Sequence, residues 1–283
     1  MLVTVLWGIA FLSALAMAAA VSFRAFTGVM AVDRDRIHTI ALLTAGLELA
    51  AGLIQSAPER PLVGVEGSIA LASGTVAARL NDEGGRIDIG RAPPEVLTAL
   101  LVHVGAPPLQ AEELAQRMVA RRRVEDSEPP DAGRTRAPQR RNEASDADPP
   151  FSDVRQLAQI PGMAPQWVAA MLPLATVYGS ETVNPLTSPA AVIAALPGVS
   201  QPALETFLQM RRGLAADEPR LHQVLGPAQK YLAVRPQRVV AVDLVARLSN
   251  GATASAQAVI VLLPKDSQPY RVLSWTAPAQ GSR

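Results

Sequence analysis

The 283-residue sequence contains no cysteine. That absence excludes a disulfide-stabilised scaffold, a thiolate nucleophile and a zinc site built on cysteine. Charged residues make up 18% of the chain and aromatic residues 4%, while hydrophobic residues reach 49%, which excludes a disordered charged tail. With 26 Lys and Arg against 25 Asp and Glu, the net charge of +1 provides no overall field that attracts nucleic acid or an anionic membrane. Any partner must therefore be recognised through a local surface.

The sequence also lacks the motifs of common catalytic and nucleotide-binding sites. It has no Gly-x-Ser-x-Gly nucleophile elbow, no Walker loop and no His-x-x-x-His pair. Adjacent acids such as Glu112 and Glu113 do not share a helix face, so they do not form a catalytic pair. We therefore expect a protein that is not an enzyme.

A long uncharged run opens the chain, from residue 1 to residue 23. At ~1.5 Å per residue it would extend ~34 Å as a helix, enough to cross a ~30 Å hydrocarbon core. A cleaved signal peptide is the alternative, because alanines between residues 14 and 20 supply small residues near a cleavage point. No basic segment precedes the run, however, and the run is longer than a signal peptide needs. We predict a single-pass membrane anchor over residues 1–23, which includes Thr4, Val5 and Trp7.

The helical pattern continues beyond this anchor. No proline occurs between Arg24 and Ala57, and residues of one helix face recur at spacings of three and four. These residues are Ile37, Ile40, Thr44, Leu47, Ala51 and Ile54. We predict one helix over about residues 3–55, whose amphipathic half at 24–56 covers a sheet with this face and meets neighbouring helices above the membrane.

A first β region lies in residues 57–90. Ser68–Leu80 alternates apolar or small residues with polar ones around Gly74, and a turn leads from there into Arg86–Ile89. This pattern predicts a short antiparallel meander.

A second β region lies in residues 237–283. Arg238–Leu248 and Ala256–Leu263 flank an Asn-Gly turn, and Tyr270–Trp275 follows as a last strand. Neither β region has enough strands to form a stable sheet alone, so we expect both to join one small sheet.

Between the two β regions, residues 91–236 show helical stretches broken by proline and glycine. Within them, residues 124–150 are rich in Pro, Arg, Asp, Glu and Ser and predict a flexible linker. The fold class is therefore α+β: a long amino-terminal helix on a small antiparallel sheet, with a large all-α domain inserted between sheet strands.

The insert contains an internal repeat with an offset of 96 residues, in which Ile87–Leu100 matches Val183–Leu196. Each copy begins with Asp or Asn, reaches a proline at the start of a helix, and continues to a second helix that ends on arginines. The arginines are Arg121 to Arg123 in the first copy and Arg211 and Arg212 in the second.

Four segments together resemble type II secretion system protein K, a minor pseudopilin family of the general secretion pathway. The segments are Leu2–Gly8, Asp82–Ile89, Phe151–Met163 with its Ile-Pro-Gly-Met ending, and Tyr270–Trp275. They occur in the family's order over nearly the whole chain. The resemblance implies a pilin-like fold with a helical insert, which agrees with the architecture expected from periodicity.

The resemblance also implies a location, a role and partners. Proteins of this family are anchored in the inner membrane with the amino terminus toward the cytoplasm and the globular body in the periplasm. They cap a pseudopilus with minor pseudopilins I and J, above the major pseudopilin, and so support export of folded proteins across the outer membrane. We expect no nucleic-acid partner on this interpretation.

Two features of the amino terminus bear on this resemblance. A prepilin begins with a basic leader, whereas this sequence starts inside the apolar run, so we expect either that the leader was removed or that the start codon was assigned late. Most pilin-like subunits also carry a glutamate at the fifth mature position, which the K family lacks. Thr4 or Val5 would occupy that place here, which suits a subunit with no neighbour above it.

The resemblance further implies calcium in the globular part. Asp82 and Asp88 flank a Gly-Gly turn, where carboxylate and carbonyl oxygens can converge, so these two residues are the candidate ligands.

A nucleic-acid-binding membrane protein is the alternative hypothesis. The turns Ile160–Met163 and Leu196–Val199 look like helix-hairpin-helix turns, whose backbone amides can hold phosphate. The arginine clusters at the ends of the repeats would supply positive charge. The neutral net charge and the few aromatic residues favour the assembly protein instead.

Overall fold

The computed structural model describes residues 2–56, 61–127, 151–213, 223–235, 238–263, 266 and 268–276. Within the helices, a few side chains lie outside this description, namely those of residues 2–5, 9, 19–29, 31, 123–127, 212 and 213. The predicted linker at 124–150 falls almost wholly outside the described residues.

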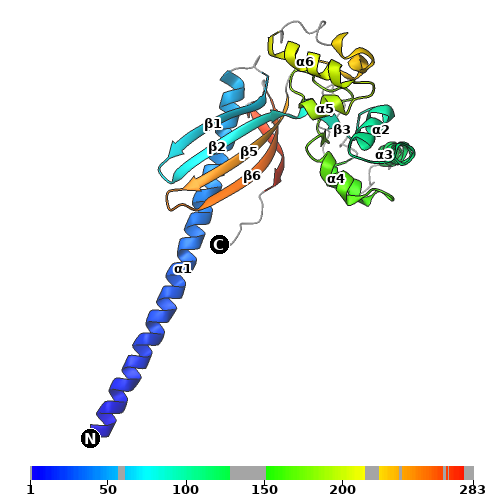
Figure 1. The fold of residues 1–283 in the computed structure, drawn as a ribbon. Coiled ribbons are helices and arrows are strands. Elements are labelled where there is room, and N and C mark those ends of the chain that lie inside the picture. Colours follow the sequence, from blue (N-terminus) through cyan, green and yellow to red (C-terminus); the bar gives the residue numbers. More distant parts are fainter. Residues whose placement is uncertain are drawn as a thin grey trace.

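Helix α1, Leu2–Ser56, is one continuous helix of 55 residues and confirms the predicted helix. At ~1.5 Å per residue it is about 80 Å long. Its amino-terminal half projects from the body, and its carboxyl-terminal half lies along one face of a sheet (Figure 1).

The sheet has five antiparallel strands in the order β1-β2-β5-β6-β7. The strands are β1 Val63–Leu71, β2 Gly74–Asp82, β5 Val239–Leu248, β6 Thr253–Leu262 and β7 Tyr270–Thr276. Strands β2 and β5 are direct neighbours, with Asp82 opposite Val240, although about 155 residues separate them in sequence. The two β regions therefore form a single interrupted sheet, and the predicted α+β, pilin-like fold is confirmed.

One predicted strand is wrong. Arg86–Ile89 does not continue the meander, because the chain leaves the sheet at Asp82 and turns through the 3-10 helix η1, Glu83–Gly85. Only β3, Ile87–Asp88, is extended there, and it pairs in parallel with β4, Ala175–Thr176, within the insert. A two-residue strand is too short to show a period in the sequence, and alternation cannot reveal its partner.

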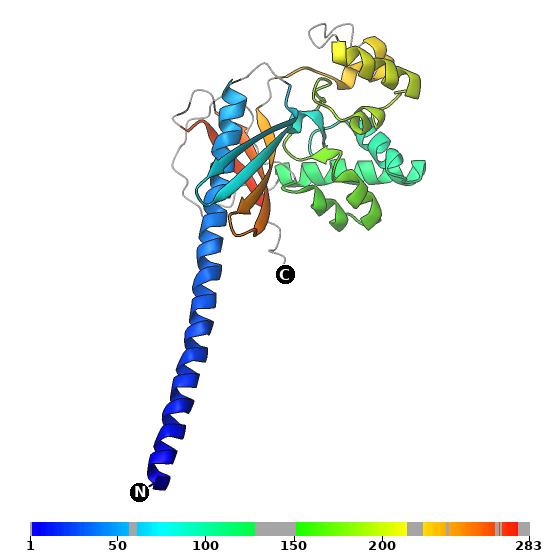
Figure 2. The ribbon, with the colours of Figure 1, turned by 60° about the vertical axis from the view of Figure 1, so that its left-hand side comes forward.

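The insert consists of short helices around its own core. Its elements are α2 Pro94–His103, α3 Pro108–Ser127, η2 Val154–Gln159, α4 Pro165–Met171, α5 Ala190–Ala194, α6 Gln201–Gly213 and η3 Gly226–Tyr231. Both views show it to one side of the sheet, next to the end of β2 where the chain leaves the sheet (Figures 1 and 2).

Two separate hydrophobic cores hold the molecule together. One lies between α1 and the sheet and includes Leu42, Val76 and Val242. The other lies inside the insert and draws its buried residues only from positions 87–232, with Phe151 and Phe207 among the largest. Because the two cores share no residue, the insert packs as a unit of its own.

The face of α1 that packs on the sheet differs from the predicted face. Leu47, Ala51 and Ile54 are buried as expected, but Ile37 is 65% and Ile40 55% exposed. The residues of α1 that pack against the sheet instead include Leu42, Leu43, Leu47, Ala50 and Ile54. The prediction was wrong because apolar residues occupy more than one side of this half of α1, so spacing alone does not select the packed stripe.

Gly46 marks the closest approach of α1 to the sheet. A Cβ atom there would lie 2.7 Å from Leu244 Cδ2 and 2.8 Å from Val76 Cγ2. The absence of a side chain therefore lets the helix axis settle onto β2 and β5 at this point.

Candidate functional site

A buried carboxylate at the end of β2 fastens the insert to the sheet. Asp82 is 5% exposed. Its Oδ1 accepts a hydrogen bond from the Gly84 amide at 3.0 Å, and its Oδ2 accepts from the Thr187 hydroxyl at 2.6 Å and the Asn184 side-chain amide at 3.2 Å. The Asn184 backbone amide also donates to the Gly84 carbonyl at 2.8 Å. Asp82 therefore joins the sheet to the second copy of the repeat.

A second buried acid follows directly. Glu83 pairs with Arg86 at 3.1 Å, and its side chain is almost fully enclosed. Burial raises the pKa of Asp82 and of Glu83, and the hydrogen bonds of the first and the charge of Arg86 on the second only partly oppose that rise. Both carboxyl groups therefore hold a proton more readily here than they would in water.

Asp88 and Asn184 occupy equivalent positions in the two copies of the repeat, and each accepts backbone hydrogen bonds from the residues that follow it. Oδ1 of Asp88 accepts from the Gly90 amide at 2.7 Å and the Arg91 amide at 3.1 Å, while Oδ1 of Asn184 accepts from the Leu186 amide at 3.2 Å. Each side chain thus closes an Asx turn that leads into a helix. Burial raises the pKa of Asp88, whose Oδ2 lies beside the backbone of Gly179.

These surroundings do not fit a calcium site. Ca²⁺ takes six to eight oxygen ligands, largely carboxylates and carbonyls. Both oxygens of Asp82 and one oxygen of Asp88 already accept hydrogen bonds from protein donors. Within the described ranges, no group of three or more His, Cys, Asp or Glu side chains is arranged to hold a metal ion. Asp82 and Asp88 therefore serve here as acceptors that shape the chain.

Two of the arginines that end the repeats, Arg122 and Arg211, point inward. Arg122 donates from Nε to the Ile89 carbonyl at 3.1 Å and from Nη1 to the Ala92 carbonyl at 2.9 Å. Arg211 donates from Nη1 to the carbonyls of Pro185 at 3.0 Å and Ser188 at 2.6 Å. Positions 185 and 188 are the repeat equivalents of 89 and 92, at the offset of 96. The two arginines are therefore equivalent latches, each of which closes the loop of its own copy.

Other basic residues near the proposed phosphate-binding turns are also engaged within the protein. Arg117 donates from Nη1 to the Pro161 carbonyl at 2.7 Å, and Arg121 donates to Gln159 at 3.1 Å and lies over the Phe151 ring. The turn at Gly162 thus packs against α3. Among the arginines whose side chains the structure describes, Arg121, Arg122 and Arg211 thus donate to the protein itself, which weakens the nucleic-acid hypothesis.

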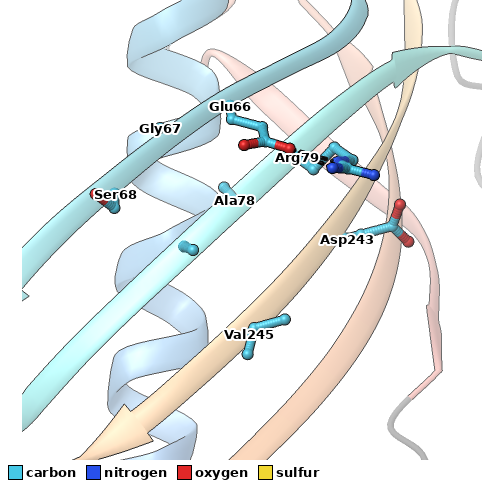
Figure 3. A pocket seen from close by; sticks show the side chains of 8 residues that line it. Glu66, Gly67, Ser68, Ala78, Arg79, Asp243 and Val245 are labelled. Atoms are coloured by element: carbon cyan, nitrogen blue, oxygen red, sulfur yellow. Dashed lines mark hydrogen bonds and ion pairs between the residues drawn. The ribbon is translucent and has the colours of Figure 1, made fainter.

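The outer face of the sheet carries a shallow hollow of about 590 Å³ (Figure 3). Its lining comes from β1, β2 and β5 and consists of Glu66, Gly67, Ser68, Ala77, Ala78, Arg79, Asp243 and Val245. Arg79 Nε donates to Glu66 Oε1 at 2.7 Å, and both side chains are largely exposed. Asp243 accepts from Gln257 at 2.9 Å. An exposed ion pair of this kind contributes roughly 0–1 kcal/mol and provides no catalytic group.

The residues predicted for the anchor and for assembly lie along α1. The side chains of Thr4 and Val5 fall outside the described residues, and Trp7 is exposed. Leu47 packs on the sheet, while Ile37 and Ile40 remain uncovered. Among the described residues, one stretch is long and apolar enough to cross a membrane, Val32–Ser56, but nearly half of it is buried against the body. Leu6–Ala18 forms a shorter apolar stretch whose described side chains face outward.

Sequence reasoning missed the partners that give these residues their roles. Thr187 carried no signal, because a hydroxyl that meets a carboxylate 105 residues away leaves no local pattern. The latch function of Arg122 and Arg211 could have been found from the repeat, since the matched loops and the helix-ending arginines recur together.

Comparison with known proteins supports the resemblance. Residues 78–180 match the family model for type II secretion system (T2SS) protein K, and this segment runs from β2 through the first copy of the repeat to just beyond β4. The structure matches a chain of the crystal structure of the GspK-GspI-GspJ complex from the type 2 secretion system of enterotoxigenic Escherichia coli. The TM-score is 0.60 and the identity 16%, over 88% of this chain and 98% of that chain. No relative matches among curated protein sequences.

The long helix, the interrupted sheet and the inserted helical domain define a pilin-like α+β fold. The similarity to type II secretion system protein K, which the sequence motifs indicate, is confirmed by the family match and by the shared fold.

Proposed function

We propose that this protein is a minor pseudopilin that caps the tip of a type II secretion pseudopilus and acts through contacts with other subunits rather than by catalysis. The observation that carries the proposal is the match of residues 78–180 to protein K, because these residues build the insert's first module and its attachment to the sheet. In this role the protein supports export of folded proteins across the outer membrane.

The place of the insert supports a position at the tip. A pilin-like subunit stacks by packing its long helix beside those of its neighbours. The insert adds a second core beside the sheet, and its upper part reaches farther from the amino terminus than α1 does, so it would obstruct a subunit stacked above (Figure 2). A bulky domain there suits a subunit that has neighbours below and beside it but none above.

Anchoring follows from the exposed apolar half of α1. Among the described side chains of this half, Leu6, Phe11 and Leu15 are largely exposed. Lipid would satisfy them, which supports a single-pass anchor over residues 1–23 in the inner membrane with the body in the periplasm.

The expected partners are the minor pseudopilins I and J, and below them the major pseudopilin. The solved structure with the same fold is a complex that contains GspI and GspJ.

Co-purification tests the proposal. The tagged full-length chain, co-expressed with minor pseudopilins I and J and extracted in mild detergent, should retain both in about stoichiometric amounts. An unrelated single-pass inner-membrane protein with the same tag is the control. Recovery of the tagged chain without either pseudopilin, at expression levels that give all three proteins, would overturn the proposal.

A further inference from the structure

The side of the sheet that α1 covers is left open at its β7 edge. Val272 and Trp275 pair with Ile260 and Ala258, which are fully buried under α1, so the register places all four on the α1 side. Nevertheless Val272 is 40% and Trp275 43% exposed. Helix α1 lies over β1, β2 and β5 and reaches only the margin of β6. An apolar strip of strand β7 therefore stands uncovered beside the helix.

The side of α1 that faces this strip is apolar as well. The Tyr270 hydroxyl donates to Glu48 Oε1 at 2.8 Å, which fixes Glu48 on the β7 side of the helix. Residues four, eight and eleven positions earlier lie on the same side, and these are Thr44, Ile40 and Ile37. Ile37 and Ile40 are the two large apolar residues whose predicted contact with the sheet is not made. They continue the uncovered strip down the helix.

The opposite, β1 side of α1 lacks such a stripe. Leu53 marks that side, because a Cβ at Gly67 of β1 would come within 2.5 Å of Leu53 Cδ1. Residues at helical spacing below Leu53 are Leu49 and Ala45, both half-buried, then Leu42, which is buried, and then His38. Ile69 and Leu71 on β1 are 39% and 44% exposed, much like Val272 and Trp275, but among the described side chains of α1 no exposed large apolar residue accompanies them on this side. The two flanks of α1 are therefore unlike.

We infer that the β7 flank, made of Ile37, Ile40, Thr44, Val272 and Trp275, is the surface that receives the amphipathic helix of a neighbouring pilin-like subunit. The inference rests on the proposed function and adds which side of the protein the neighbour occupies. A neighbour anchored in the same membrane must run its helix beside α1, and this strip follows α1 lengthwise.

The structure favours a helix over a strand as the occupant. Strand β7 has an irregular register between Val259 and Ile260, where Leu273 has no opposite residue. A bulge of this kind interrupts the ladder that an added strand would extend. The apolar contacts, by contrast, are spread over a helix and a strand, as an inserted helix requires. Glu48 and Tyr270 close the upper end of the strip with polar groups.

Matched aspartate variants test the inference in the full-length chain co-expressed with minor pseudopilins I and J. Val272→Asp should reduce the co-purified pseudopilins about tenfold, because a charge would be buried in the centre of the contact. Ile69→Asp is the control, since Ile69 lies on the same face at the opposite edge with equal exposure. It should leave the yield unchanged. Protease resistance of both purified variants shows whether each is folded.

The cysteine-free sequence allows a second, direct measurement. Val272→Cys and Ile69→Cys each introduce a unique thiol, which can be cross-linked to single cysteines placed along the helix of a partner pseudopilin. Val272→Cys should give a heteromeric product and Ile69→Cys should not. Three outcomes would overturn the inference while leaving the proposed function in place. They are cross-linked products from Ile69→Cys alone, a homodimer through Val272→Cys, and full partner recovery with Val272→Asp. If the unmodified chain retains no pseudopilin, the result contradicts both the inference and the proposed function.

Discussion

Arg122 and Arg211 show how much of the insert depends on single side chains. Each guanidinium binds two carbonyls of the loop that opens its own repeat, at equivalent positions in both copies. Several donors in a fixed planar geometry make this contact, which a lysine ammonium cannot reproduce. The latch is therefore specific to arginine.

Arg122→Gln should lower the free energy of unfolding of the insert by about 1–3 kcal/mol, because the carbonyls of Ile89 and Ala92 lose their donors. Arg122→Lys should recover only part of that loss. Arg155→Gln is the control, since the exposed Arg155–Asp153 pair contributes little. Thermal unfolding of the purified chain measures all three, and equal melting temperatures for Arg122→Gln and Arg155→Gln would contradict the latch.

The pKa of Asp88 makes the stability of the insert depend on pH. Burial raises this pKa above the ordinary value of 3.8, against the charges of Arg91 and Arg122. The folded state therefore binds a proton more tightly than the unfolded state. The contribution of Asp88 to stability is largest below about pH 3.8 and is lost as pH rises through the raised folded value.

Asp88→Asn should flatten this dependence, because Asn184 already closes the same turn in the second copy without a charge. From pH 4 to pH 7, the melting temperature of the variant should change less than that of the unmodified chain. Melting curves across that range provide the measurement, with Asp153→Asn at an exposed site as the control. Parallel curves for all three proteins would refute the expectation.

At the scale of elements, the contact between α1 and the sheet depends on a glycine. Gly46 faces Leu244 and Val76 at distances that leave no room for a methyl group, whereas Gly52 faces open space on the same helix. Alanine substitutions at these two positions therefore distinguish the effect of packing on stability from the effect of helix propensity.

Gly52→Ala should stabilise the chain by about 1 kcal/mol, because alanine is the better helix former. Gly46→Ala should instead destabilise it by about 1–3 kcal/mol, since overpacking of the core outweighs the same propensity gain. Circular dichroism melts of the detergent-solubilised full-length variants compare the two. A gain in both variants would show that α1 does not approach the sheet as closely as the structure indicates.

Patterns that extend over many residues were predictable from the sequence, and those that depend on tertiary partners were not. The length of α1, the strands β5 and β6, and the repeat at Asp88 and Asn184 all have periodic signals. The strand at Ile87–Asp88 and the exposure of Ile37 and Ile40 do not, because each is decided by what packs nearby. For the candidate site, the sequence proposed Asp82 as a calcium ligand, whereas the fold shows it as a hydrogen-bond acceptor of Thr187 and Asn184.

At the scale of the whole molecule, the insert behaves as a removable unit. It leaves after Asp82 and returns before Val239, and these strand ends are neighbours in the ladder. Its hydrophobic core shares no residue with the core under the sheet. We therefore expect that removal of the insert leaves a folded pilin-like core.

Replacement of residues 83–239 by an Asn-Gly turn, which keeps Asp82 opposite Val240, should give a folded protein with α1 packed on five strands. The turn is favourable because antiparallel neighbours need only two connecting residues. Solubility in detergent, a cooperative melt and protease resistance would confirm this, while an aggregated or fully digested product would count against separate cores.

The attachment of the insert to β2 and β5 also sets how the molecule transmits force. Neither strand is at an edge: β2 is bonded to β1 and β5, and β5 to β2 and β6. A load applied to the insert along the strands therefore acts in shear on the β1–β2 and β5–β6 ladders, so that many hydrogen bonds share it at once. A load across the strands would open the same bonds one after another. Single-molecule pulling should give a higher rupture force along the strands than across them, so the attachment of the insert is mechanically strongest in the direction of β2 and β5.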